Sequence, residues 1–136
     1  MSTGTVFRCR QCTRPLSNSV EQQAWQPLPR IKGRAHYTYG PSHVPQGRFA
    51  AAPEPYNPRV SSELDWVIHP ADAVGMGPHP NTARLYGCCR RDGADGPNLV
   101  CAGCGAEVGI EVSDCWTAYD TRLRKSAVVA HERPLP

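Results

Sequence analysis

The chain carries two motifs of the same kind, Cys9-Arg10-Gln11-Cys12 near its start and Cys101-Ala102-Gly103-Cys104 in its last third. A Cys-x-x-Cys turn points both sulfurs toward one place, and two such turns supply the four thiolates of a structural zinc site. Because residues 13–100 lie between the motifs, a shared ion would join the first strand of the domain to one of its last. We therefore predict that Zn²⁺ is bound by Cys9, Cys12, Cys101 and Cys104.

The residue after each motif bears on this prediction. Such a turn needs, directly after its second cysteine, a residue that tolerates positive φ and lets backbone N–H groups approach the sulfur. Gly105 meets this need in the second motif, whereas Thr13 stands at the equivalent place in the first.

A different pairing stays open, in which Cys88 and Cys89 share the ion with Cys101 and Cys104. Neighbouring side chains on a strand point to opposite faces, so a Cys-Cys dipeptide chelates poorly unless it lies on a turn. This geometric argument favours the pairing of the two Cys-x-x-Cys motifs.

Under that pairing Cys88, Cys89 and Cys115 remain. Together with His69 or His79 they could form a second metal site, or one of them could be a redox-active nucleophile. The plainer interpretation is that they are small buried residues, as cysteines often are.

Composition limits the choice of protein class. The 136 residues include 14 Pro and 12 Gly, and large aliphatic residues are few, so metal cross-links are the most evident source of stability. A net charge of +3 is too small to indicate a nucleic-acid partner by itself. No apolar run has the length of a secretory signal or a membrane span, and seven cysteines suit a reducing compartment. We therefore expect a cytoplasmic protein without a membrane partner.

The pattern of residues predicts a mainly β domain over residues 1–130, with small antiparallel sheets joined at the four-cysteine zinc, as in a zinc ribbon. A long proline-rich loop is expected over 26–58, and a C-terminal tail over 131–136. We expect short strands at 5–8, 15–20, 36–39, 64–69, 98–100, 108–112 and 119–123.

Two of these strands alternate cleanly between apolar and polar residues. Val108, Ile110 and Val112 would face the core in one strand. In the next, Tyr119, Thr121 and Leu123 would face inward, against Asp120, Arg122 and Arg124 on the solvent side.

A ligand pocket is predicted near Trp66, Cys115 and Trp116, partly covered by the 36–58 loop. Asp114 interrupts the apolar alternation, which indicates a β-bulge at 113–114, and bulges re-aim side chains beside functional sites. Aromatic walls with a few polar groups are typical of small-molecule pockets. The alternative is that both tryptophans are ordinary core residues.

Basic residues near the N-terminus lie among aromatic ones, a mixture that can bind single-stranded nucleic acid by charge and stacking. A solvated face with a few packed rings is the simpler interpretation. The basic residues are Arg8, Arg10, Arg14, Arg30, Lys32 and Arg34, and the aromatic ones are Phe7, Trp25, Tyr37 and Tyr39.

The two distant motifs, with Leu16 after the first and Gly105, Val108 and Gly109 after the second, resemble the β-tent zinc fold. That group includes Yippee-like proteins, the thalidomide-binding domain of cereblon and the B-type methionine sulfoxide reductases. The resemblance implies two β-sheets that meet at one zinc held by four cysteines. In addition, the stretch from Gly87-Cys88-Cys89 to Asp114-Cys115-Trp116 is similar to one found in uncharacterised bacterial proteins.

These observations predict a zinc-stabilised binding module for a small ligand or a protein partner, with no catalytic residue assigned. One alternative, implied by the resemblance, is a thiol-dependent reductase of the methionine sulfoxide type that uses Cys115. The setting Ser113-Asp114-Cys115-Trp116 differs from the Arg-Tyr-Cys-x-Asn of those reductases. A zinc-ribbon nucleic-acid binder is the other alternative.

Overall fold

The computed structural model describes residues 3–28 and 39–134. Within these residues short strands predominate, and the only helical segments are two 3-10 turns. In chain order the elements are β1 (Thr3–Cys9), β2 (Glu21–Gln22), β3 (Arg48–Ala51), β4 (Asp65–Ile68), η1 (Pro70–Asp72), β5 (Met76–Pro78), η2 (Thr82–Leu85), β6 (Leu99–Cys101), β7 (Glu107–Val112), β8 (Asp120–Arg124) and β9 (Val128–Pro134).

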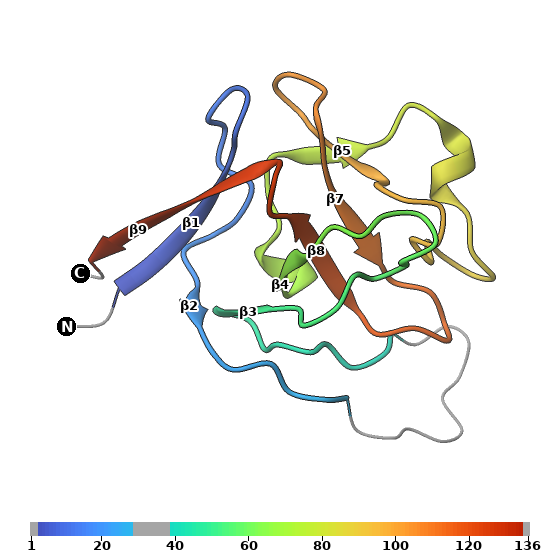
Figure 1. Ribbon diagram of the computed structural model, residues 1–136, viewed down its shortest axis with the longest axis horizontal. Helices are drawn as coiled ribbons and strands as arrows, with labels where there is room; N and C mark the ends of the chain where they lie inside the picture. The colour runs from blue at the N-terminus through green and yellow to red at the C-terminus, as the bar shows by residue number, and fades with distance from the viewer. Residues whose placement is uncertain (1–2, 29–38, 135–136) are drawn as a thin grey trace.

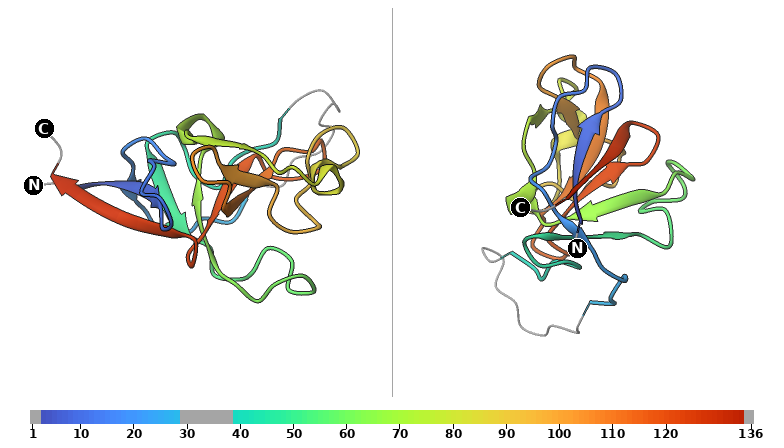
Figure 2. Two further views of the ribbon diagram at one scale, coloured as in Figure 1. Left: turned by 90° about the horizontal axis from the view of Figure 1, so that it is seen from above. Right: turned by 90° about the vertical axis from the view of Figure 1, so that its left-hand side faces the viewer.

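The strands form two sheets of very different size (Figure 1). β1 and β9 pair antiparallel as a two-stranded ribbon, from Thr3 opposite Pro134 to Cys9 opposite Val128. The larger sheet has the order β2-β3-β4-β8-β7-β6-β5, in which all neighbours are antiparallel except the short β2–β3 pair. Figure 2 shows the ribbon extending from one end of the molecule. The prediction of a mainly β fold with small sheets joined at a four-cysteine cluster is confirmed.

The main core lies where the ribbon meets the larger sheet. Phe7 of β1 is fully buried, and its ring packs edge-on against Phe49 of β3 with 5.0 Å between centroids. Trp66 of β4 completes this aromatic group, 5.8 Å from Phe7. Two buried cysteines, Cys9 and Cys101, belong to the same core, so the ends of β1 and β6 are fixed by apolar packing as well.

The alternation predicted for residues 108–112 is present in β7, where Val108, Ile110 and Val112 are buried. On the opposite face of the same strand, Gly109 lies close to β8. A Cβ at Gly109 would come within 2.6 Å of the Arg122 carbonyl oxygen, so this pairing requires a glycine.

The prediction that Asp120 and Arg122 of β8 face the solvent is wrong. Asp120 and Arg122 are only 1% and 6% exposed. β8 lies in the middle of the larger sheet, and Ser42, His43 and Glu54 of the proline-rich segment form hydrogen bonds with Asp120 or Arg122. Arg122 accordingly donates to the Glu54 carbonyl as well as to Asp65. The sequence of β8 alternates as in a half-buried strand, but the strand is buried on both faces.

Three other predicted segments differ from the structure. Residues 131–134 are the end of β9 rather than part of a tail, because they pair with the start of β1. The predicted 26–58 loop contains β3, which pairs with β4 despite the prolines around it. Residues 15–20 form only isolated bridges instead of a regular strand, with Pro15 and Val20 opposite β1 and Ser17 opposite Ala73. Most of the strand predicted at 36–39 lies outside the described residues.

In the described part of the chain, no helix has the length and apolar character needed to cross a membrane.

The buried ion pair between β4 and β8 yields a first prediction. Burial raises the pKa of Asp65, which its hydrogen bond with Arg122 at 2.9 Å partly opposes. Arg122→Met would leave the carboxylate buried without its cation, and we expect a loss of about 3 kcal/mol in unfolding free energy. Denaturant titration measures this loss. The loss in unfolding free energy should become smaller as the pH falls, because protonation of Asp65 removes the buried charge.

The double variant Asp65→Asn/Arg122→Met is the control. It should be more stable than Arg122→Met alone, since no unpaired charge remains. Equal losses in the single and double variants would contradict this account of the pair.

Candidate metal centre and second cysteine cluster

The two Cys-x-x-Cys motifs have the same local backbone structure. In each, the carbonyl of the first cysteine accepts a hydrogen bond from the residue after the second cysteine. The N–H of the first cysteine donates to the carbonyl one residue further on. These bonds are Thr13 N to Cys9 O (2.8 Å), Gly105 N to Cys101 O (2.9 Å), Cys9 N to Arg14 O (2.8 Å) and Cys101 N to Ala106 O (2.8 Å).

Both turns close through a residue with positive φ. Thr13 has φ of 68° and Gly105 has φ of 78°, and Thr13 is the only non-glycine residue with positive φ in the described chain. A threonine in the left-handed region is costly, so the rest of the structure must hold it there. The first motif therefore adopts the knuckle conformation although its sequence is less suited to it.

The four sulfurs of the two motifs converge. All lie within 4.8 Å of one another, with 3.6 Å between Cys9 Sγ and Cys104 Sγ and 3.4 Å between Cys12 Sγ and Cys101 Sγ. A tetrahedral ion with metal–sulfur bonds of about 2.3 Å places its ligands about 3.8 Å apart, which is close to these distances. The structure thus brings Cys9, Cys12, Cys101 and Cys104 together and leaves Cys88 and Cys89 elsewhere.

The elements around the cluster explain this convergence. Cys9 ends β1 and Cys101 ends β6, so each knuckle is the turn that follows a strand. The two turns lie side by side at the top of Figure 1, one blue and one orange. Gly75 fits between them: its carbonyl accepts from Ala102 N, and a Cβ there would lie 2.3 Å from the Pro15 carbonyl oxygen.

The electrostatics of the cluster favour a cation. Burial opposes ionisation of Cys101, but the backbone N–H groups of Cys104 and Gly103 lower its pKa to about 7. The N–H of Ala106 has the same effect on Cys104, yet burial and the neighbouring thiol of Cys9 raise the pKa of Cys104 to about 12. The first thiolate forms readily and then opposes ionisation of the others, and a bound cation relieves this repulsion. The donor set and the spacing therefore fit a metal ion.

A second cluster joins the three remaining cysteines. The sulfurs of Cys88, Cys89 and Cys115 lie within 4.8 Å of one another, and Cys88 Sγ and Cys89 Sγ are 3.9 Å apart. Cys88 and Cys89 are exposed, whereas Cys115 is buried. Neither His69 nor His79 belongs to this group: His69 caps η1, and His79 contacts Glu107.

Asp114 organises the backbone of the second cluster. Its carboxylate is fully buried and accepts hydrogen bonds from four backbone N–H groups and one indole. Although burial alone would raise its pKa, these backbone donors hold the pKa of Asp114 well below its usual range. The donors are Cys88 N (2.6 Å), Cys89 N (2.8 Å), Arg90 N (3.1 Å), Cys115 N (2.7 Å) and Trp116 Nε1 (3.1 Å).

Sequence reasoning missed this role of Asp114, which it interpreted as the sign of a bulge at 113–114. β7 ends at Val112, and its irregular register with β6 lies between Leu99 and Val100 instead. The available signal was an acidic residue beside Cys115, but three of its five donors come from a turn 24 to 26 residues away.

The structure does not bring Trp66 and Trp116 together. Trp66 pairs in register with Leu123 near the end of β8 and packs in the main core, with Lys125 Nζ 4.2 Å from its ring centroid. Trp116 precedes the start of β8 and is 64% exposed. Only Trp116 adjoins the second cluster, through its bond to Asp114.

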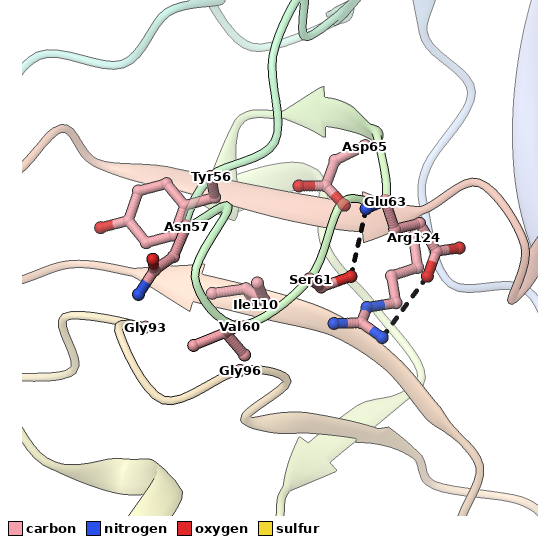
Figure 3. Close-up of a pocket in the computed structure, with 10 residues that line it drawn as sticks. All are labelled: Tyr56, Asn57, Val60, Ser61, Glu63, Asp65, Gly93, Gly96, Ile110 and Arg124. Carbon is pink, nitrogen blue, oxygen red and sulfur yellow. Dashed lines mark hydrogen bonds and ion pairs between the residues drawn. The ribbon is translucent and has the colours of Figure 1, made fainter.

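Two hollows differ sharply in size. The one in Figure 3 lies between residues 56–65 and the 93–96 turn, and its volume is only about 20 Å³, which leaves no room for an organic ligand. Another, beside η1, measures about 300 Å³, at the lower limit of small-molecule sites. Its lining residues are Tyr39, Pro70, Ala73, Val74, Met76, Leu99, Glu111, Tyr119 and Thr121.

Aromatic contacts shape one side of this larger hollow, which we call the η1 hollow. The rings of Tyr39 and Tyr119 are stacked with 4.3 Å between centroids, and His69 packs edge-on against Tyr119 at 5.6 Å. The sequence did not predict this aromatic group: His69 was a candidate metal ligand and Tyr39 a candidate nucleic-acid contact, and Tyr39, His69 and Tyr119 come from three distant segments.

Compared with models of known protein families, with curated proteins and with solved structures, the chain matches none.

The role of Asp114 can be tested by Asp114→Asn, which keeps the shape but loses the charge. An amide NH₂ would face backbone donors, so we expect a loss of about 2–4 kcal/mol in unfolding free energy at neutral pH. A carboxylate with a depressed pKa stabilises the fold above its ordinary pKa near 4 and less as the pH falls. The difference between wild type and variant should therefore diminish in acid, as measured by denaturant titration across pH. A difference that stays constant with pH would refute the carboxylate's role.

Proposed function

We propose that this chain is a small binding module whose sheets are joined by one structural zinc ion, held by Cys9, Cys12, Cys101 and Cys104. The observation that carries the proposal is the convergence of four sulfurs at near-tetrahedral spacing. Four protein thiolates complete the coordination of zinc and leave no position for a substrate, which is typical of structural sites. Zinc would here link the ribbon to the larger sheet.

The proposal includes an architecture of the β-tent kind, in which two sheets meet at the ion. It also includes a reducing location such as the cytoplasm, where seven cysteines remain thiols or metal ligands.

The geometry favours binding over thiol catalysis. Cys115 is only 8% exposed, and the thiol of Cys89 together with burial raises the pKa of Cys115 to about 12. A nucleophilic cysteine needs the opposite, an accessible thiol with a lowered pKa. We therefore do not extend the proposal to the reductase.

Nucleic-acid binding is also less favoured, because the first arginines serve the fold itself. Arg10 donates to the carbonyls of Ser126 and Val128, and Arg8 donates to that of Thr13. The other half of the predicted basic group, Arg30, Lys32 and Arg34, lies outside the described residues.

For the ligand we propose a small, flat molecule in the η1 hollow. Its volume of about 300 Å³ suits a compact ligand, and the Tyr119 ring provides a planar wall. Met76, which also lines the hollow, packs against the main core that contains Cys9 and Cys101. The structural ion would thus hold one wall of the binding site in place.

Removal of the ion tests the structural part of this proposal. The purified protein should contain zinc, and a strong chelator at neutral pH should abolish its β circular dichroism, because metal binding energy is folding energy here. Cys12→Ser and Cys104→Ser should be destabilised to a similar extent, since each removes one ligand of the same ion. Elemental analysis and thermal unfolding measure these effects.

A chelated, metal-free protein with an unchanged thermal midpoint would disprove the structural role. If the protein contained iron instead of zinc, the proposed site would stand but the proposed ion would be wrong, since four thiolates also bind iron.

Occupation of the η1 hollow tests the binding part. In an NMR screen of small aromatic compounds, we expect shifts to concentrate on Met76, Tyr119 and Thr121. Val74→Trp should abolish them by filling the hollow from its rim, where Val74 is 38% exposed. Val129→Trp is the matched control, because Val129 is 41% exposed on β9 and does not line the hollow. Shifts that are scattered over the surface, or equal in both variants, would argue against this site.

A further inference from the structure

We propose that Cys88, Cys89 and Cys115 form a second, exchangeable metal site for a thiophilic ion of the zinc and cadmium class. Their three sulfurs lie within 4.8 Å of one another, although Cys115 follows Cys89 by 26 residues in the sequence. This inference does not depend on the proposed function, because it concerns a different set of ligands on a different part of the chain.

The obstacle to chelation by adjacent cysteines is absent here. On a regular strand Cys88 and Cys89 would point to opposite faces. In the structure they lie instead on a bend, and both of their N–H groups donate to the same Asp114 carboxylate. This wrapping around one carboxylate turns both thiols toward Cys115.

The bend is tightly packed. A Cβ at Gly87 would lie 1.8 Å from the Arg90 carbonyl oxygen and 2.4 Å from Asp114 Oδ2, so only glycine fits at this place. Cys115 belongs to the same arrangement, because its own N–H donates to Asp114 Oδ1 at 2.7 Å. One buried carboxylate therefore positions the backbone of all three cysteines, and the sulfurs are brought together before any ion binds.

The donor atoms select the class of ion. Three thiolates are soft ligands, which prefer zinc, cadmium or monovalent copper to magnesium or calcium. Asp114 is not a fourth ligand, since both of its oxygens accept N–H hydrogen bonds.

Exposure distinguishes the two clusters. In the first, Cys9 and Cys101 are each 1% exposed and part of the core, Cys104 is half-buried and only Cys12 is exposed. In the second, Cys88 and Cys89 are both exposed and only Cys115 is buried. An ion in the second cluster would face the solvent, so we infer that it exchanges with ions and ligands in solution while the first ion stays bound.

The test is a count of bound cadmium under reducing, anaerobic conditions. Purified protein is incubated with excess Cd²⁺, separated from unbound ions and analysed for metal per chain. We expect two ions in the wild type and one in Cys88→Ser/Cys89→Ser. The variant should keep the wild-type thermal midpoint, because both side chains are exposed. A mild chelator should remove one of the two ions from the wild type without loss of circular dichroism.

Gly87→Ala is the matched control, since it retains all seven thiols and disturbs only the bend. It should bind one ion firmly and the other with at least tenfold weaker affinity. One ion in both the wild type and Cys88→Ser/Cys89→Ser would overturn the second site and leave the structural site intact. A wild-type mass lower by two hydrogens under these conditions, removed by Cys88→Ser/Cys89→Ser, would also overturn it in favour of a disulfide.

Discussion

The contact among the sulfurs of Cys9, Cys12, Cys101 and Cys104 is the constraint on which this fold depends. It joins the end of β1 to the end of β6, and so ties the two-stranded ribbon to the seven-stranded sheet. Apolar packing supports the same junction, since Phe7 and the two buried cysteines share one core. Four thiols this close are unstable as thiolates without a cation, so core and ion are expected to stabilise each other.

Buried carboxylates hold the loops in place by hydrogen bonds. A chain with so many prolines and glycines has few regular backbone hydrogen bonds in its connections, and buried aspartates accept bonds from the segments that need them. Asp120 accepts from Ser42 and from both His43 N and His43 Nδ1, which fastens the proline-rich segment to β8. Asp72 binds Gly47 N, Asp65 binds Arg122, and Asp114 binds the bend that carries Cys88 and Cys89.

Features that depend on neighbouring residues were predictable from the sequence, and those that depend on distant partners were not. The knuckles and the alternation of β7 are local, because spacing and period suffice to recognise them. The burial of Arg122 could not be predicted, since it follows from Asp65 and Glu54 on other segments. β3 and the end of β9 have weak local β propensity, and they form strands because they pair with β4 and β1. For the second cluster the sequence supplied the three cysteines, but the bend that directs them depends on Asp114.

The most direct test of the central claim is zinc X-ray absorption spectroscopy on a protein in which Cys88, Cys89 and Cys115 are replaced by serine. Only the first cluster can then bind the ion through sulfur. The account predicts one zinc per chain with four sulfur neighbours at about 2.3 Å. A shell that contains nitrogen or oxygen neighbours at about 2.0–2.1 Å, or a protein that retains no zinc, would contradict it.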